Sequence, residues 1–232
     1  MLLLTLRGTP TLYCGDEIGM RQGAIAPDQV RDPFEKNVPG IGVGRDGCRT
    51  PMQWNATAGA GFSTAATWLP LADDYSSENV ANLDFDASSI LSLYKALIAL
   101  RRKLPQLVKG AYQPVAAQGD ILLYRRYGEG EAVVVALNLG GEPVSVASSS
   151  RGVGREILLS TFLDRGGEQV QGTLDLRGNE GVILGAPLRQ DDLSCRWHRY
   201  RCRCVSGGSR GRRPDTIGSR SLPASACVCP AH

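Results

Sequence analysis

The apolar positions in residues 86–104 recur every three or four residues and form a single stripe. That stripe consists of Ile90, Leu93, Tyr94, Leu97, Leu100 and Leu104. This spacing is typical of an amphipathic helix that buries one face. Asp86 or Ser88 can cap its first turn. Basic residues at 101–103 suit its last turn, and Pro105 ends it. We therefore predict a helix over residues 86–104.

After residue 110 the apolar runs become short and are separated by glycine-rich turns at 128–130 and 140–141. The predicted strands are residues 121–127, 131–139, 144–147, 155–161, 171–176 and 181–185. Short strands in succession, with no helical pattern between them, favour an antiparallel β-sandwich.

The first eighty residues contain few periodic segments. Residues 1–6 are predicted to be the last turn of a helix. The apolar run at residues 11–14, entered through Gly8 and Pro10, is predicted to be a short buried strand. Residues 21–80 are rich in Gly, Pro, Asp and Asn and are predicted to be a long loop, of a length that is usually functional. A parallel α/β barrel presents its site on such loops at the C-terminal face.

Composition changes near residue 189, where apolar periodicity ends. Residues 191–232 carry eight Arg and three acidic residues, so they account for the net charge of +3, and the rest of the chain is mildly acidic. That remainder shows no basic face suited to nucleic acid. We predict that residues 190–232 are disordered. A shifted reading frame would also produce this composition.

Cysteine follows the same division, since five of the seven lie after position 194. Their spacing is not a usual zinc arrangement, so we predict no metal. Cys14 and Cys48 alone do not make a disulfide framework, which suits a reducing compartment. The N-terminus does not read as a signal peptide, and no apolar run is long enough to span a membrane. These features predict a cytoplasmic protein.

Two motifs near the N-terminus are the most specific signal. Residues 8–20 read GTPTLYCGDEIGM, and residues 44–54 read GRDGCRTPMQW. In sequence and order they resemble the α-amylase superfamily (glycoside hydrolase family 13), within its α-glucosidase and oligo-1,6-glucosidase branch. The resemblance covers roughly residues 1–188.

The resemblance implies an α/β part followed by an all-β part. Residues 1–106 would be the C-terminal remnant of a catalytic (β/α)8 barrel, comprising its last strand, a long substrate-side loop and its last helix. Residues 107–189 would be an antiparallel β-sandwich C-terminal domain, followed by the tail at 190–232. The family's catalytic Asp, Glu and second Asp lie on barrel strands four, five and seven, which this chain lacks. We therefore expect a C-terminal fragment that is inactive alone.

Four residues are candidates for substrate binding. By the resemblance, Arg45 reaches the sugar in the −1 subsite, while Arg49 either binds substrate or braces the loop. A guanidinium can hold a carboxylate and a sugar hydroxyl at once. The other reading of both arginines is a surface side chain paired with Asp46 or Asp16. Asp32 and Glu35 match a loop that often approaches the acceptor subsite.

Other residues are assigned structural roles. Asp16 and Glu17 are adjacent and point to opposite sides of an extended chain, so they cannot form a catalytic carboxyl pair about 5 Å apart. We expect them to bond loop amides or an arginine. Trp54 is expected to pack the loop, although it could stack on sugar rings, as could Trp68 and Tyr75. Residues 1–190 contain no His, which excludes a His-based triad there.

The leading interpretation is part of an α-glucosidase that hydrolyses α-glucosidic bonds of small oligosaccharides with retention, without a cofactor. Its expected partner is the oligosaccharide, with no nucleic acid or membrane. One alternative is a noncatalytic carbohydrate-binding or structural β domain. Another is a related transglycosidase, such as a sucrose isomerase or a trehalose synthase.

Overall fold

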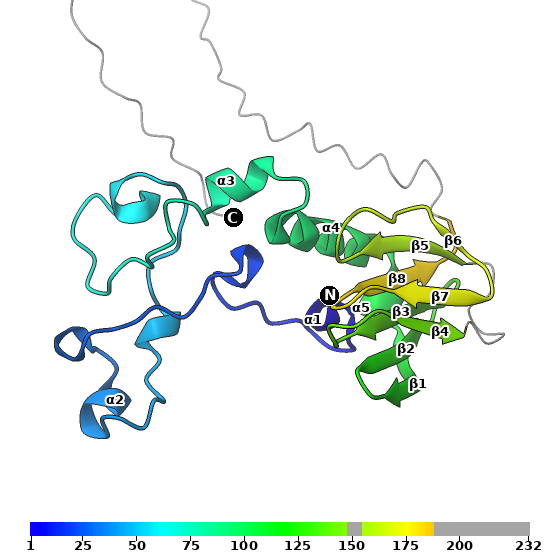
Figure 1. The fold of residues 1–232 in the computed structure, drawn as a ribbon, viewed down its shortest axis with the longest axis horizontal. Coiled ribbons are helices and arrows are strands. Elements are labelled where there is room, and N and C mark those ends of the chain that lie inside the picture. Colours follow the sequence, from blue (N-terminus) through cyan, green and yellow to red (C-terminus); the bar gives the residue numbers. More distant parts are fainter. Residues whose placement is uncertain (148–154, 188–232) are drawn as a thin grey trace, which may run out of the picture. The chain divides into compact units, whose positions relative to one another are not determined.

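A computed structural model describes residues 1–147 and 155–187 (Figure 1). Its α-helices are α1 (Leu2–Thr5), α2 (Pro33–Asn37), α3 (Val80–Phe85), α4 (Ile90–Lys103) and α5 (Pro105–Val108). Short 3-10 turns are η1 (Asp16–Ile18), η2 (Pro27–Gln29), η3 (Asp46–Cys48) and η4 (Ala58–Gly61). None of the described helices has the length and apolar content needed to cross a bilayer. The predictions made for residues 190–232 lie outside the described residues.

The helix predicted over residues 86–104 is confirmed as α4, but both proposed caps are wrong. The N-cap is Ser89, whose hydroxyl accepts a hydrogen bond from the Ser92 amide at 3.1 Å. Asp86 instead accepts hydrogen bonds from the amide and the hydroxyl of Ser88, which forms a turn before the helix. The competition among several short polar residues therefore shifts the start of the helix to Ile90.

The ends of α4 are flanked by two helices that the apolar pattern did not predict. Helix α3 begins after Asn79, whose side chain accepts a hydrogen bond from the Asn82 amide at 3.0 Å. Helix α4 ends at Lys103, before Pro105 as predicted, and Pro105 is the first residue of the short helix α5. Proline suits this position, since the first turn of a helix needs no amide donor there.

The strand predicted at residues 11–14 is wrong. Residues 9–12 form no backbone–backbone hydrogen bond with any described residue, and residues 11–14 are exposed. A strand needs a neighbouring strand to receive its hydrogen bonds, and the described residues place none beside this segment. Gly15 and Gly19 have the positive φ values, 95° and 67°, that favour glycine at the two ends of η1.

The second half of the described chain forms two antiparallel sheets. Their strands are β1 (Ala111–Gln118), β2 (Ile121–Tyr127), β3 (Val133–Asn138), β4 (Val144–Ala147), β5 (Arg155–Ser160), β6 (Gln169–Val170), β7 (Thr173–Leu176) and β8 (Gly181–Gly185). The larger sheet has the order β1-β2-β3-β8-β5-β6, and the smaller one pairs β4 with β7. The strand predicted at 171–176 is found as β7 of the smaller sheet, and the short β6 just before it was not predicted.

Strand β1 was not predicted, because Pro114 interrupts its pattern. Strand β1 lies at the edge of the larger sheet, where proline is tolerated although Pro114 has no backbone N–H to donate. The register with β2 shifts between Pro114 and Ala116, so a bulge accommodates the proline.

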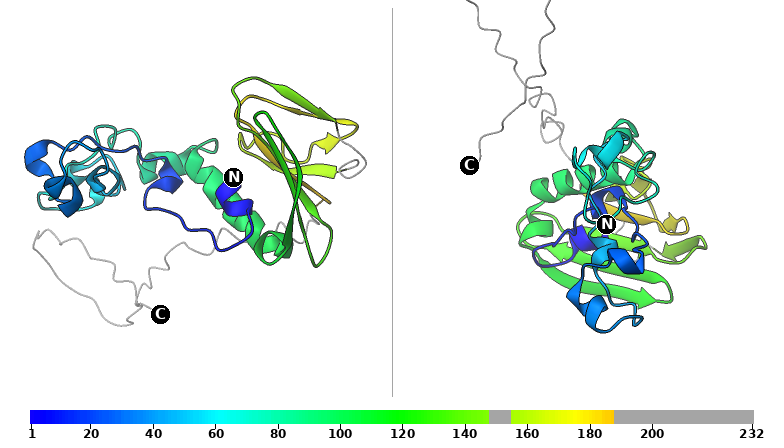
Figure 2. Two further views of the ribbon diagram at one scale, coloured as in Figure 1. Left: turned by 90° about the horizontal axis from the view of Figure 1, so that it is seen from below. Right: turned by 90° about the vertical axis from the view of Figure 1, so that its left-hand side faces the viewer.

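The larger sheet buries apolar side chains on both faces. One face packs against α4, α5 and α1, through residues that include Leu97, Leu107 and Val135 (Figure 2). The other face packs against the smaller sheet, through residues that include Ile157 and Leu176. This double burial explains why all six residues of β3 are buried.

Buried polar contacts connect the sheet to the segment that leads into the first motif. Arg126 on β2 is fully buried and donates hydrogen bonds to the carbonyl oxygens of Thr5, at 2.5 Å, and Gly110, at 2.8 Å. The hydroxyl groups of Tyr124 and Thr5 also form a hydrogen bond, 2.5 Å long, and burial raises the pKa of Tyr124 to about 12. Arg101 on α4 donates to the Gly8 carbonyl. The end of α1 is thus held by both the sheet and α4.

Candidate functional site

The predicted substrate-binding residues lie in one loop, where the buried carboxylate of Asp32 is the central group. Asp32 is 3% exposed and is the N-cap of α2, accepting a hydrogen bond from the Phe34 amide at 3.0 Å. It also accepts from the backbone amide of Arg45 at 2.8 Å. The side chain of Arg45 donates to it twice, from Nε at 2.9 Å and from Nη2 at 3.0 Å. These hydrogen bonds from Arg45 hold the pKa of Asp32 well below its usual range.

Arg45 is therefore fixed on one side and open on the other. Its side chain is 56% exposed although its carboxylate partner has no exposed side-chain area. The bidentate pair uses Nε and Nη2, and Nη1 has no partner among the described residues. The pairing with Asp46 or Asp16 that we considered from the sequence is wrong. Arg45 can act as a brace for the loop and still present hydrogen-bond donors to a ligand.

Two further carboxylates fix the backbone around this pair. Asp46, 7% exposed, accepts hydrogen bonds from the amides of Arg31 at 2.5 Å and Asp32 at 2.8 Å. Glu35 accepts from the amides of Gly40 and Gly44, each at 3.1 Å. Asp32, Glu35 and Asp46 thus all have defined structural partners within residues 31–46.

Arg49 differs from Arg45 in its surroundings. Its side chain is exposed and forms no hydrogen bond or ion pair with a described residue. Only its backbone amide is engaged, donating to the Asp46 carbonyl at 2.9 Å. The structure therefore offers no contact through which the side chain of Arg49 would brace the loop.

The loop also brings the two sequence motifs together. The Tyr13 hydroxyl of the first motif lies 3.8 Å from Cys48 Sγ of the second. Cys14 Sγ lies 3.9 Å from Met52 Sδ. A cavity of about 90 Å³ between the motifs is lined by residues that include Asp16 and both cysteines, which are free and exposed.

Asp16 and Glu17 have the loop-bonding role that we expected. Asp16 accepts a hydrogen bond from the Tyr13 amide at 2.9 Å, and Glu17 accepts from the Gly15 amide at 3.1 Å. Each carboxylate accepts from an amide two or three residues earlier and so closes its own turn. They stabilise the bend between the extended segment and η1.

The packing role expected for Trp54 is met only in part, because about half of its side chain is exposed, and its neighbour Gln53 is the buried residue. Trp54 is 49% exposed, and Trp68 is 74% exposed. Gln53 is fully buried. Its side-chain amide donates a hydrogen bond to Asp74 Oδ1 at 2.8 Å, and its backbone carbonyl accepts one from the Val80 amide at 2.9 Å. The sequence pointed to Gln53 only through its place in the second motif, where it is the polar residue between Met52 and Trp54. The two tryptophans are thus accessible surfaces rather than core.

Metal ligands and matched proton donors are not grouped in the described part of the chain. It contains no cluster of three or more His, Cys, Asp or Glu side chains that could hold a metal ion. Its carboxylates with clearly displaced pKa values, which include Asp32 and Glu180, are all displaced downward. Such groups stay ionised near neutral pH and do not act as proton donors.

Known proteins match large parts of this chain. Residues 1–110 match the family model for the α-amylase catalytic domain. The chain is 34% identical over 141 residues to a probable α-glucosidase of Rhizobium meliloti (strain 1021), which covers 61% of this chain and 26% of that protein. It is 32% identical over 183 residues to a glucan 1,6-α-glucosidase of Streptococcus dysgalactiae subsp. equisimilis, covering 71% and 34%.

Solved structures of related enzymes share the fold. The trehalulose synthase MutB from Pseudomonas mesoacidophila MX-45 superposes with a TM-score of 0.69 at 28% identity, over 79% of this chain and 36% of that one. The α-glucosyl transfer enzyme XgtA superposes with a TM-score of 0.70 at 32% identity, over 80% and 34%. The chain thus spans about a quarter to a third of the length of these relatives.

Proposed function

We propose, from the fact that residues 1–110 belong to the α-amylase superfamily, that the chain supplies the substrate-side loop and C-terminal portion of an α-glucosidase. The whole enzyme would hydrolyse α-glucosidic bonds of small oligosaccharides with retention. Residues 1–106 would contribute to the catalytic barrel, and residues 107–189 would form its C-terminal β-sandwich domain. The free thiols of Cys14 and Cys48 support a reducing, cytoplasmic location.

The pair formed by Arg45 and Asp32 carries this proposal. A buried carboxylate fixes the guanidinium in one orientation, so its remaining donors are presented without a further loss of side-chain freedom. Hydroxyl-rich ligands such as sugars accept hydrogen bonds from donors fixed in this way. We assign Arg45 to sugar binding, and Asp32 and Glu35 to the loop that carries it. Arg49 remains a candidate for direct contact because its guanidinium is unpaired among the described residues.

We further propose that the nucleophile and the proton donor come from another part of the whole enzyme. Retaining hydrolysis needs two carboxyl groups about 5–5.5 Å apart. The carboxylates of the first motif and of residues 31–46 are engaged by backbone amides or by Arg45; they are Asp16, Glu17, Asp32, Glu35 and Asp46.

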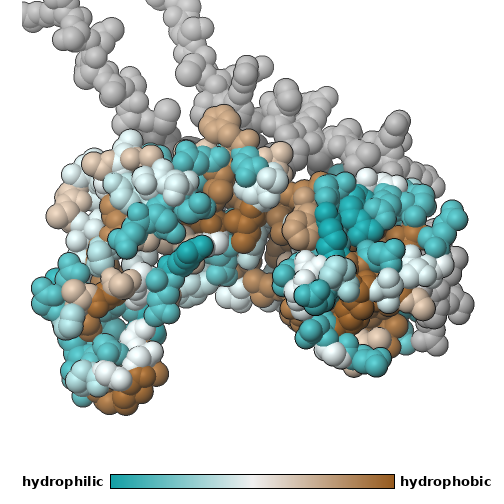
Figure 3. All heavy atoms as spheres, viewed as in Figure 1, coloured by the Kyte–Doolittle hydropathy of each residue, from teal (hydrophilic) through white to brown (hydrophobic). Residues whose placement is uncertain are grey.

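The surface of residues 1–110 supports this division. Large apolar side chains are exposed there, including Leu12 at 39%, Ile41 at 61% and Phe85 at 93%, and apolar patches are visible in Figure 3. Residues 9–12 also leave their backbone groups unpaired among the described residues. Apolar surface and unpaired backbone groups of this kind are normally covered by further protein.

A chimera tests the proposal directly. Residues 1–187 would replace the matching segment of the Rhizobium relative, and both this chimera and the chain alone would be assayed on p-nitrophenyl α-glucoside. We expect turnover by the chimera and none by the chain alone. Turnover by the chain alone that survives removal of contaminating enzyme would contradict the proposal. So would a folded chimera without activity, provided that the parent relative is active under the same conditions.

A transglycosidase is the second candidate, because the structural relatives include a trehalulose synthase and an α-glucosyl transfer enzyme. Both reactions would use the same loop, and they differ in whether water or a sugar hydroxyl accepts the glucosyl group. Product analysis of the chimera on sucrose and maltose separates them. Release of free glucose alone supports hydrolysis, whereas new disaccharides or longer products support transfer.

A further inference from the structure

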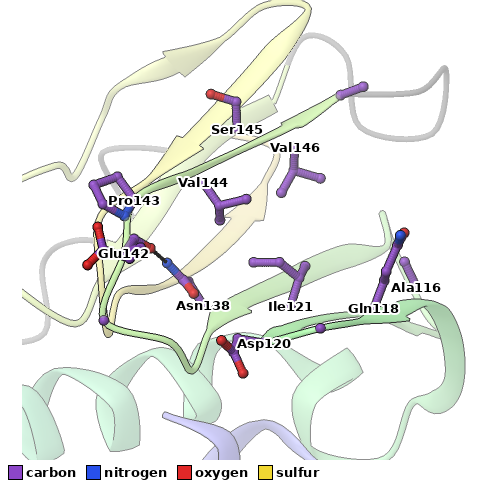
Figure 4. Close-up of a pocket in the computed structure, with 13 residues that line it drawn as sticks. Ala116, Gln118, Asp120, Ile121, Asn138, Glu142, Pro143, Val144, Ser145 and Val146 are labelled. Atoms are coloured by element: carbon purple, nitrogen blue, oxygen red, sulfur yellow. Dashed lines mark hydrogen bonds between the residues drawn. The ribbon is translucent and has the colours of Figure 1, made fainter.

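A cavity away from the candidate site lies between the two sheets. It has a volume of about 610 Å³ and is lined by the β1–β2 hairpin, the turn after β3, and β4. Val144 and Val146 point from β4 toward Ile121 across it, whereas Ser145 points away (Figure 4). The cavity is therefore a groove with apolar side chains along its centre.

One wall of the groove is a strand with an unpaired edge. Among the described residues, β4 pairs only with β7, and the residues of β4 form no backbone hydrogen bond on the other side. The side chains of β7 pack with those of β5 and β8, while β4 lines the groove together with β1 and β2. The free edge of β4 therefore lies on the side of the β1–β2 hairpin, where Ile121 and Ala116 line the groove.

One end of the groove is acidic. Asp120 lies against Gly140, and the backbone of Glu142 is held by a hydrogen bond from the Asn138 side chain to its carbonyl at 2.7 Å. Both carboxylates thus flank the turn after β3. Their side chains are exposed and form no hydrogen bond or ion pair with a described residue.

Arg125 provides a positive charge further along the same surface. Ile121, Leu123 and Arg125 alternate along β2 and so share one face, which is the face that packs toward β4 and β7. Arg125 has no hydrogen bond or ion pair to a described residue, and its Nε is shielded from solvent without a partner. From Ile121 to Arg125 the strand rises about 13 Å, at roughly 3.3 Å per residue. Arg125 lies beyond the residues that line the groove, and its shielded Nε lacks an acceptor among the described residues.

We propose that this groove binds an extended peptide segment of another protein, which adds to the free edge of β4. Antiparallel pairing is the slightly more stable arrangement. Strands β4 and β2 both start at the acidic end of the groove, with Val144 and Ile121 respectively. A segment that pairs antiparallel with β4 therefore has its C-terminal end at the acidic end. The segment carries an acidic side chain opposite Arg125 and an apolar side chain two residues later, level with Leu123 on β2. A basic side chain follows four residues after the acidic one, level with Ile121 and near Asp120 and Glu142.

The probe is a fluorescein-labelled peptide with the core Glu-Thr-Val-Thr-Lys, titrated with the purified chain and followed by fluorescence anisotropy. The comparison peptide, Lys-Thr-Val-Thr-Glu, has the same composition with its charges exchanged. We expect saturable binding of the first peptide and at least fivefold weaker binding of the second. Equal binding of the two peptides, or no saturation at millimolar chain, would overturn the proposal.

Protein variants locate the site. Asp120→Lys lies in an exposed turn and leaves the sheet intact; it should weaken the first peptide about five- to tenfold and favour the exchanged peptide. Glu129→Lys, an equal change of charge at an exposed turn outside the groove, is the matched control and should change neither affinity. Equal effects of the two variants would show that net charge, not the groove, directs binding.

The edge of β4 is tested separately. Val146→Pro removes a backbone donor from an edge strand and should abolish binding of the first peptide, while circular dichroism confirms that the sheets remain folded. If this variant loses its fold, Val146→Lys tests the apolar centre instead. Sedimentation gives the oligomeric state. If the chain forms a dimer, and Val146→Lys dissociates this dimer while the peptide does not, then the edge of β4 binds a second copy of the chain. That result would overturn the proposal.

Discussion

Replacing the buried carboxylate of Glu180 should destabilise the β-sheet part of the chain. Glu180 is fully buried and accepts hydrogen bonds from Ser160 Oγ at 2.8 Å, from Arg177 Nη2 at 2.7 Å and from Arg165 Nη1 at 3.1 Å. Burial alone would raise its pKa, but hydrogen bonds from the side chain and backbone of Arg177 and from Ser160 hold the pKa at about 2. The charged form of Glu180 is therefore favoured by the folded state.

The lowering of the pKa of Glu180 sets the size of the expected loss in folding stability. The ordinary value is 4.5 and the folded value about 2, and each unit of difference corresponds to about 1.36 kcal/mol. Linkage then gives up to about 3 kcal/mol of folding stability at neutral pH. For Glu180→Gln we expect a loss approaching this value, and a fall in Tm of roughly 6–12 °C, at 2–4 °C per kcal/mol for a domain of this size. The actual loss should lie below this limit because Arg177 is partly exposed and keeps its pairing with Asp164.

The sign of the pH dependence follows from the lowered pKa. The contribution of Glu180 is fully present above pH 4.5 and is lost as the pH falls toward 2. Urea unfolding followed by circular dichroism should therefore show a large difference between the parent chain and Glu180→Gln at pH 7 and a small one near pH 2.5. Glu168→Gln is the matched control, because Glu168 pairs with Arg165 in the same network but its side chain is 45% exposed. Its loss should stay below about 1 kcal/mol.

Two results would refute the reasoning. A difference between Glu180→Gln and the parent chain that is constant from pH 7 to pH 2.5 would mean that packing, not charge, determines the effect. Equal losses from Glu180→Gln and Glu168→Gln would mean that burial does not strengthen the interaction.

Three further predictions concern the site and its supports. In an active chimera, Arg45→Ala should lower kcat/KM more than Asp32→Asn, because the second change removes only the brace and leaves the donors; equal losses would make Arg45 a structural residue alone. Ser89→Ala should cost about 1 kcal/mol of stability in thermal unfolding and Ser88→Ala less than half of that, since only Ser89 caps α4; the reverse order would contradict the assigned cap. Hydrogen exchange should be fastest in residues 21–80 and slowest in β3 and β8, and strong protection throughout the loop would contradict this.

The regular elements were predictable where a single period governs the sequence. The six strands expected after residue 110 are all represented, since short apolar runs and glycine turns reflect burial between layers. Strand β1 and helix α3 were missed because their stability comes from context. An edge position tolerates Pro114, and the Asn79 cap starts a helix whose own sequence has no clear stripe. The segment at residues 11–14 failed in the opposite way, because its sequence favours a strand and the described residues provide no neighbour.

The site shows a further limit of sequence reasoning. The residues that form it were found from the motif and the loop, but their pairing was not, because Asp32 and Arg45 are separated by 13 positions without regular structure. Loop geometry depends on which amides each carboxylate accepts from, and here Asp46 is already occupied by the amides of Arg31 and Asp32. Arg45 consequently turns to Asp32, the remaining carboxylate within reach that is buried. The choice of partner matters for function. Because Asp32 is buried, it holds the guanidinium of Arg45 from one side, and the other side stays exposed and open to a ligand.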